Sequence, residues 1–372
     1  MNNQVLKIIS ISDIHAGAMD PAFMYNTLTD QFINRIRPLD FDVLAICGDV
    51  FDSKFMSNNP IIMYTLQLMD DIVNLCREKQ ATLIIIGGTQ SHDNGQLILF
   101  YKYLNDPTID FRIVEDIRFE YIKGLKVLCI PEKYGIPVEE YNKVLFQSGG
   151  YDLVLMHGTI KGSIYGAEME KLDSTHAPVF SLRSFENCGG LVLAGHVHTP
   201  GCFEEYMYYN GCPIRYKFGE EETKGFLVTL YNPYTRMHYT ELIPIDSYIY
   251  KTIDIDHILN EDPKNIINHI KNIKEEQGID FIRIRFNNMT DNMEIVTNYF
   301  RNNGNVKFQE MGKKEKQVQA VDEVVLERMN EYSYILDDTL SEYDKFTMYI
   351  NQNEGYEFIT VDELISILED NI

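Results

Sequence analysis

The sequence predicts an α/β fold for residues 1–245, built around a buried sheet of parallel or mixed strands. Apolar runs of four to seven residues alternate there with segments whose apolar residues recur at helical spacing. Continuous apolar runs are typical of strands covered on both faces, and the intervening helices are the crossovers that parallel strands need. After residue 245 the alternation becomes shorter and more polar, which predicts a second, small α+β module.

The predicted strands of the first part are apolar and often β-branched, and they cover residues 6–12, 41–47, 81–86, 125–130, 153–156 and 191–194. Helical spacing predicts helices over residues 23–36 and 60–77. The stretch from Tyr206 to Leu242 holds many aromatic residues with several Gly and Pro and little helical period, so β-hairpins are expected.

The small module is predicted over residues 246–312. Its expected strands cover residues 253–256, 281–286 and 305–309, and its expected helices cover residues 262–276 and 292–301. Pro263 suits the first turn of the earlier helix, because a proline there removes no hydrogen bond. In the strand from Phe281 to Phe286 the period of two places Arg283 and Arg285 on one face.

Residues 313–372 are predicted to form a linker followed by a helical tail. They hold five Lys and Arg against fifteen Asp and Glu. An apolar stripe at spacings of three and four residues comprises Val318, Val321, Val325, Met329, Tyr332 and Leu336. Such a stripe packs either on the chain's own body or in the groove of a partner, and the sequence leaves both interpretations open.

The bulk composition is that of an ordinary globular protein, with 45% hydrophobic and 24% charged residues. No apolar run is long enough to cross a membrane, and no secretory signal is expected at the N-terminus. Six scattered cysteines without a Cys-x-x-Cys pair suit free thiols in a reducing cytoplasm. The net charge of −23 excludes a surface that attracts nucleic acid as a whole, so any affinity for DNA must come from metal ions, a local basic face or a partner.

Five short polar motifs occur in order, each just after an apolar run. They are Ser12-Asp13-Ile14-His15, Gly48-Asp49-Val50-Phe51-Asp52, Ser91-His92-Asp93, His157-Gly158 and Gly195-His196-Val197-His198. Because neighbouring strands end along a common edge of a sheet, these side chains are expected to converge. Asp and neutral His together suit Mn, Fe or Zn, and two ions about 3.5–4 Å apart need a shared carboxylate, for which Asp49 is the natural bridge.

Each motif alone has an ordinary structural explanation. An Asp-x-His triplet occurs often by chance, and Gly-Asp after a strand is usually a turn. The signal is the ordered set, each member at the end of a strand, which holds five of the nine histidines. That ordering predicts a metal site.

The ordered set resembles the signature of the calcineurin-like metallophosphoesterases over residues 5–245. This resemblance implies a four-layer α/β/β/α sandwich with two metal ions above the sheets. It implies that the first ion is held by Asp13, His15, Asp49 and His198. The second ion would be held by Asp49, His157, His196 and a residue that is Asn in most of the family. His92 matches the catalytic histidine that protonates the leaving oxygen, and Asp93 is expected to orient it.

The chain departs from the family pattern just before His92. The usual step is Gly-Asn-His-Asp, whereas this chain reads Gly87-Gly88-Thr89-Gln90-Ser91-His92-Asp93. A Ser hydroxyl is a poorer ligand than an Asn carbonyl, so the second ion is expected to bind more weakly. Ser91 is the expected fourth ligand, with Thr89 or a water molecule as alternatives.

The residues after the second motif favour a phosphodiester substrate. Phosphoprotein phosphatases of this superfamily carry an Arg there, which clamps a phosphomonoester dianion, but here Asp52 is followed by Ser53-Lys54-Phe55. Purple acid phosphatases have a metal-binding Tyr where Asp52 stands. A phosphodiester carries a single negative charge and needs less cationic clamping.

Segments 12–17, 48–52 and 157–160, with the module and the tail, resemble SbcD-type nucleases, the bacterial and phage relatives of the eukaryotic meiotic-recombination nuclease. The resemblance implies a nuclease domain (1–245), a DNA-binding capping domain (246–312) and a tail (313–372) that binds an SbcC-like coiled-coil ATPase. It implies a homodimer that cuts duplex ends as an exonuclease and single strands or hairpins as an endonuclease. The expected ion is Mn²⁺, with Mg²⁺, Fe or Zn as alternatives. The expected location is the cytoplasm of a bacterium or a phage-infected host. The expected process is DNA repair, recombination or replication.

Two other functions remain open from the sequence. A small-molecule phosphodiesterase or nucleotidase would work alone and would not need residues 246–372. A non-catalytic scaffold of the same fold would not need the near-complete set of metal ligands.

Overall fold

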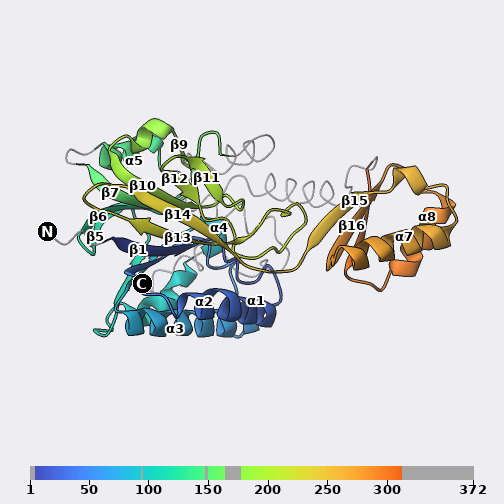
Figure 1. Cartoon of the computed structure of the whole chain (residues 1–372), viewed down its shortest axis with the longest axis horizontal. Coiled ribbons are helices and arrows are strands. Elements are labelled where there is room, and N and C mark those ends of the chain that lie inside the picture. Colours follow the sequence, from blue (N-terminus) through green and yellow to red (C-terminus); the bar gives the residue numbers. More distant parts are fainter. Residues whose placement is uncertain (1–4, 94, 147–149, 164–176, 312–372) are drawn as a thin grey trace, which may run out of the picture. The chain divides into compact units, whose positions relative to one another are not determined.

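The structure, a computed structural model, describes residues 5–93, 95–146, 150–163 and 177–311 (Figure 1). The predicted tail, with its apolar stripe from Val318 to Leu336, lies outside the described residues. Within them, no helix is long and apolar enough to cross a membrane. All six cysteines are free thiols, as the sequence predicts.

Two six-stranded sheets form the centre of the main body, as Figure 1 shows. The first sheet runs in the order β14 (His238–Pro244), β13 (Gly225–Tyr231), β1 (Leu6–Ile11), β2 (Val43–Cys47), β3 (Thr82–Ile86) and β4 (Asp110–Val114). The second runs in the order β11 (Gly201–Glu204), β12 (Met207–Tyr209), β10 (Cys188–Gly195), β7 (Tyr151–His157), β6 (Leu125–Ile130) and β5 (Arg118–Ile122). Strands β1 to β4 are parallel, as are β6, β7, β10 and β12. Strand β13 is antiparallel to both β1 and β14, β11 is antiparallel to β12, and β5 is antiparallel to β6.

The strands alternate their side chains between two apolar cores. In β2, Val43 and Ala45 face the core between the two sheets, whereas Leu44 and Ile46 face the core beneath the helices of the first sheet. A third core covers the outer face of the second sheet, where Tyr141 packs with strand residues. The order helix, sheet, sheet, helix is the predicted four-layer α/β/β/α sandwich.

Helices cover the outer face of the first sheet, along one side of the sandwich in Figure 1. They are α1 (Pro21–Leu28), the π-helical turn η1 (Thr29–Ile33), α2 (Asn34–Ile36) and α3 (Pro60–Lys79). Caps set their starts: Asp20 accepts from the amide of Phe23 before α1, and Asn59 accepts from the amide of Ile61 before α3. On the second sheet lie α5 (Val138–Leu145), η3 (Leu182–Phe185) and the short pair β8 (Thr159–Ile160) and β9 (Val179–Phe180). The turns α4 (Gln90–Asp93) and η2 (Gln96–Tyr103) follow β3.

The hairpin prediction for residues 206–242 is correct only in part. Strands β13 and β14 form the expected hairpin, and β12 pairs with β11, which starts earlier, at Gly201. Residues 210–224 form no strand. Strands β4 and β5 were not predicted, because both are edge strands with alternating charged residues and lack a continuous apolar run.

The small module has the predicted strands and helices within one or two residues at most boundaries. A three-stranded sheet runs in the order β15 (Tyr250–Asp254), β16 (Phe281–Phe286) and β17 (Val306–Glu310), with η4 (Asp256–Ile258), α7 (Pro263–Glu276) and α8 (Asp291–Phe300). The strand predicted over residues 253–256 starts earlier, at Tyr250. Arg283 and Arg285 lie on the more exposed face of β16, as its period of two predicts.

Candidate metal centre

The candidate site lies where parallel strands of both sheets end. The donor side chains that follow these ends are Asp13 after β1, Asp49 after β2, Thr89 after β3, Glu132 after β6, His157 in the last position of β7 and His196 after β10. Backbone hydrogen bonds join the loops, with the amide of Asp13 donating to Gly48 O at 3.0 Å and that of His15 to Asp49 O at 3.1 Å. The convergence expected from the sequence is therefore present.

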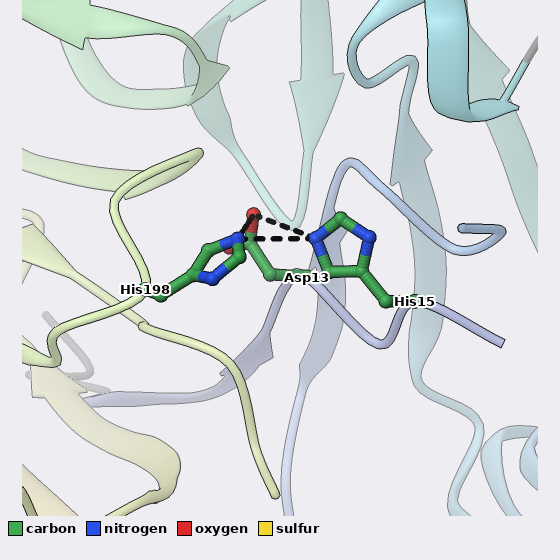
Figure 2. A group of neighbouring side chains, drawn as sticks. All are labelled: Asp13, His15 and His198. Carbon is green, nitrogen blue, oxygen red and sulfur yellow. Dashed lines mark hydrogen bonds and ion pairs between the residues drawn. The ribbon is translucent and has the colours of Figure 1, made fainter. Parts of the chain in front are cut away.

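Asp13, His15 and His198 point toward one another (Figure 2). The two Nε2 atoms are 3.1 Å apart, and Asp13 Oδ1 lies 4.0 Å from His15 Nε2 and 3.9 Å from His198 Nε2. Asp49 Oδ2 is 3.7 Å from His15 Nε2. Ions such as Zn²⁺ bind N and O atoms at about 2.0–2.2 Å, which sets neighbouring ligand atoms roughly 3–4 Å apart. These four side chains therefore fit one divalent ion.

Carboxylates lie at the far nitrogen of both imidazoles. His198 Nδ1–H donates to Glu220 Oε1 at 3.0 Å, and His15 Nδ1 lies 3.5 Å from Asp52 Oδ1. The neighbouring imidazole of His15 lowers the pKa of Asp52. Partners of this kind fix the tautomer, so that Nε2 presents its lone pair to a metal. Glu220 lies in the irregular segment 210–224 and no sequence motif marks it, whereas Asp52 ends the Gly-Asp-x-x-Asp motif and could have been predicted.

Asp49 and His157 begin a second group of donors. Asp49 Oδ2 is 3.3 Å from His157 Nε2, so the same oxygen that lies near His15 also lies near His157. His157 Nδ1–H donates to Cys47 O at 2.8 Å, which turns Nε2 toward Asp49. Burial opposes the ionisation of Asp49, but the imidazoles of His157 and His15 outweigh it and lower the pKa. Asp49 thus has the position of a bridging carboxylate.

Glu132 and His196 complete the second group. His196 Nδ1 lies 3.0 Å from Glu132 Oε2, and each of Glu132, His157 and His196 offers a ligand atom within 4.8 Å of the others. The amide of His196 also donates to both oxygens of Asp13, at 3.0 and 3.1 Å. Sequence reasoning missed Glu132, although it follows the strand of residues 125–130 as the five motifs follow theirs.

Thr89, and not Ser91, lies against this second group. Thr89 Oγ1 is 3.2 Å from both Asp49 Oδ2 and His157 Nε2, and the Thr89 amide donates to Asp49 Oδ1 at 2.6 Å. Ser91 is exposed. The chain turns into α4 at Gln90, which carries Ser91, the expected fourth ligand, to an exposed position.

His92 reaches the edge of the first group, but Asp93 does not orient it. The His92 ring lies edge-on to His15 with centroids 4.6 Å apart, and its Nδ1–H donates to the carbonyl oxygen of Asp52. Adjacent residues of a helical turn point in different directions, so the Asp93 carboxylate is directed away from the His92 ring. In this structure the backbone carbonyl of Asp52, and not the predicted Asp93, is the hydrogen-bond partner of His92 Nδ1.

Asp93 instead holds two loops together. Its Oδ1 accepts from the amides of Val50 and Phe51 at 2.9 and 3.2 Å, and its Oδ2 accepts from the amide of Gly88 at 2.8 Å. Burial and the negative charge of Asp49 raise the pKa of Asp93. These three hydrogen bonds from backbone amides hold the loop after β2 against the loop after β3, which keeps Asp49 beside Thr89.

Asp93→Ala should lower the free energy of unfolding by about 2–4 kcal/mol, because it leaves three buried amides without an acceptor. Urea unfolding followed by circular dichroism measures this loss. The matched control is Asp116→Ala, which removes an exposed ion pair with Lys133 and should cost less than about 1 kcal/mol. Equal effects of the two changes would show that the amides around Asp93 contribute nothing.

The site contains most of the unusual backbone of the described chain. Among the described residues, seven other than glycine have positive φ. Four of them belong to the site: Asp13 (51°), His15 (46°), Asp49 (52°) and His196 (93°). Such conformations cost free energy and persist where the surroundings impose them, often at functional sites. Gly88 is required for a different reason, since a Cβ atom there would collide with the backbone nitrogen and carboxylate of Asp49.

The sequence model of the calcineurin-like phosphoesterase family matches residues 6–200, just over half of the chain. The chain belongs to the calcineurin-like phosphoesterase family. Members of this metallophosphoesterase family bind divalent metal ions, and the donor groups described above are suited to that role. The matched range contains every residue of the five motifs.

Two curated relatives of this phosphoesterase are similar at low identity. A protein of Invertebrate iridescent virus 6 named "Putative phosphoesterase 244L" is 21% identical over 225 residues, which cover 57% of this chain and 74% of the viral protein. The SbcD component of the nuclease SbcCD of Staphylococcus saprophyticus is 24% identical over 258 residues, which cover 60% of this chain and 65% of the bacterial protein. A solved cold-active protein-tyrosine phosphatase of a psychrophilic Shewanella species is 13% identical and covers 64% of this chain and 82% of its own, with a TM-score of 0.29, too low to bear on the assignment.

Proposed function

We propose that this phosphoesterase is a two-metal phosphodiesterase that cuts DNA together with an SbcC-like ATPase. The observation that carries the proposal is the convergence of imidazole and carboxylate donors on two neighbouring points that share one oxygen of Asp49. Asp13, His15 and His198 would hold one ion with Asp49. A non-catalytic scaffold would have no use for this set, which favours an enzyme.

The second ion would be held by Asp49, His157 and His196. When bound, a pair of divalent ions supplies Lewis acidity and lowers the pKa of water toward neutrality, and Mn²⁺ is the ion we propose. His92 would act as the general acid. Because its Nδ1–H is donated to Asp52 O, the ring is held with Nε2 available to carry the proton that the leaving oxygen takes.

The surroundings of the site favour a phosphodiester over a phosphomonoester. The residues after Asp52 are Ser53, Lys54 and Phe55, and Lys54 is exposed. Residues 53–55 include no Arg whose guanidinium group could bind the two negative charges of a phosphomonoester. A phosphodiester, with its single negative charge, needs no such clamp.

DNA is the proposed substrate because of the similarity to the bacterial nuclease component and because of the module after residue 245. With a net charge of −23, the chain alone has little attraction for a phosphate backbone. We therefore propose that residues 246–312 cap the nuclease domain and that Arg283 and Arg285 contribute a local basic face. The partner ATPase would supply most of the DNA-binding surface.

The test uses manganese-loaded protein with linear duplex DNA and with bis(p-nitrophenyl) phosphate, in the presence and absence of an SbcC-like ATPase. We expect the small diester to be hydrolysed by the chain alone and duplex DNA to be cut efficiently only with the ATPase and ATP. Hydrolysis of cyclic nucleotides without any cutting of DNA would identify a small-molecule phosphodiesterase instead. No hydrolysis by metal-loaded protein would favour the scaffold.

Deletion of residues 313–372 should leave hydrolysis of the small diester unchanged and abolish both ATPase binding and ATP-stimulated cutting of DNA. The reason is the apolar stripe of the tail, which we propose docks in a groove of the ATPase. A matched variant, Val325→Asp with Met329→Asp, interrupts the stripe and keeps the full length. Full-strength binding by both variants would place the docking site elsewhere, and unfolding of both would make the stripe part of the chain's own core.

A further inference from the structure

We propose that Glu132 is a direct ligand of the second metal ion, in the place of the Asn that the family pattern would put before His92. The inference rests on the proposed function, because it assigns a further ligand to the same two-metal site. Its consequence is a site with one more negative charge than the family pattern implies, and therefore a stronger preference for phosphodiesters.

The position of Glu132 in the fold points it at the second group of donors. Strands β6, β7 and β10 are neighbours in the second sheet, and their ends carry Glu132, His157 and His196 in that order. The amide of Glu132 donates to Gly87 O at 3.3 Å, which ties the end of β6 to the loop that leads to Thr89. This hydrogen bond holds the end of β6, and with it Glu132, close to that loop.

Glu132 is only 4% exposed, and both of its carboxylate oxygens are buried. Among the described residues, no hydrogen bond reaches either oxygen, and the polar neighbour is His196 Nδ1 at 3.0 Å. Burying a carboxylate in this way is costly unless a cation compensates its charge. A divalent ion between Glu132, His157 and His196 would provide that charge, and Asp49 and the Thr89 hydroxyl lie next to the same point.

The charge of Glu132 has a consequence for the substrate. A neutral Asn at this position would leave the site with its two metal ions one unit more positive than Glu132 does. A phosphomonoester brings two negative charges at neutral pH and a phosphodiester brings one, so the anionic ligand disfavours the monoester more. The second ion was expected to bind weakly because the chain lacks the Asn before His92. With Glu132 as a charged ligand in its place, weak binding is no longer expected.

Glu132→Gln tests the proposal, because it keeps the size of the side chain and removes its charge. Manganese titration by calorimetry should give two tight ions per chain for the unchanged protein. In the variant we expect one tight ion and a second weakened by more than about 100-fold, beyond the loss usual for a group that only orients a ligand. The ratio of monoester to diester hydrolysis, with nitrophenyl substrates, should rise in the variant.

The matched control is Asp116→Asn, which removes one negative charge at an exposed ion pair with Lys133, the residue next to Glu132. It should bind both ions with unchanged affinity. Crystals grown with manganese should show a Glu132 oxygen at bonding distance from the second ion, about 2.0–2.2 Å. Glu132→Asp, whose carboxylate is shorter by one carbon, serves if the glutamine variant does not fold, and it too should weaken the second ion.

Two tight ions in Glu132→Gln, or a crystal in which the carboxylate contacts only His196, would overturn the inference and leave the proposed function intact. An unchanged protein that binds no manganese would instead overturn the proposed function. An unaltered substrate ratio with a lost second ion would contradict the proposed effect of the charge on substrate choice.

Discussion

Asp49→Ala should lose both metal ions and, with them, hydrolysis of the small diester. One oxygen of Asp49 lies 3.7 Å from His15 Nε2 and 3.3 Å from His157 Nε2, so its removal takes a ligand from both groups at once. Bound metal supplies several kcal/mol of transition-state stabilisation, and each 1.4 kcal/mol is about tenfold in rate. We expect the rate to fall by at least about 10³-fold. Elemental analysis of the desalted protein and a spectrophotometric rate assay measure the two effects.

Asp42→Ala is the control for this change. Asp42 precedes β2 as Asp49 follows it, and its carboxylate accepts from the amide of Lys7 at the opposite end of the strand. Its removal should leave metal content and rate intact. If Asp49→Ala keeps one ion tightly bound, Asp49 serves a single metal and is not a bridge.

His92→Ala should slow hydrolysis by about 10²–10⁴-fold while both ions stay bound. The expected loss is that of a general acid, since the ring is anchored through Nδ1 to the backbone of Asp52 and lies beside His15. The loss should be larger for DNA than for the nitrophenyl diester, because nitrophenolate leaves readily without a proton whereas a sugar oxygen does not. Parallel rate measurements on the two substrates check this difference.

His257→Ala is a suitable control for the loss of an imidazole, because His257 lies in η4, in the small module. It should change neither metal content nor rate on the small diester. If His92→Ala loses an ion, His92 is a ligand, which its closeness to His15 and Asp49 allows geometrically. If the rate falls equally on DNA and on the nitrophenyl diester, His92 does not transfer a proton to the leaving oxygen.

The main fold was predictable because buried strands are visible in the sequence as continuous apolar runs. The strands over residues 43–47, 82–86 and 125–130 lie where these runs predicted them. Edge strands β4 and β5 were missed, since one side of each has no neighbouring strand and polar residues are tolerated there. Segment 210–224 was misread as hairpin because aromatic residues and glycine occur both in hairpins and in irregular loops.

The candidate site was predictable as far as its residues lie in motifs at strand ends. Glu132 and Glu220 were missed, and Thr89 was named only as an alternative to Ser91, because their placement depends on which strands become neighbours, and a single sequence does not contain that information. The contacts of Asp93 were not foreseen for a different reason. Neighbours in the sequence were assumed to act together, but the helical turn α4 sends His92 toward the site and Asp93 toward the amides of three loop residues.

Electron paramagnetic resonance of the protein loaded with two equivalents of manganese would show whether two ions share the carboxylate of Asp49. Two Mn²⁺ ions about 3.5–4 Å apart and bridged by Asp49 should give the spectrum of an exchange-coupled pair. The coupling should vanish in Asp49→Ala and persist in Asp42→Ala. A spectrum of isolated Mn²⁺ ions in the unchanged protein at full loading would mean that Asp49 does not bridge two ions.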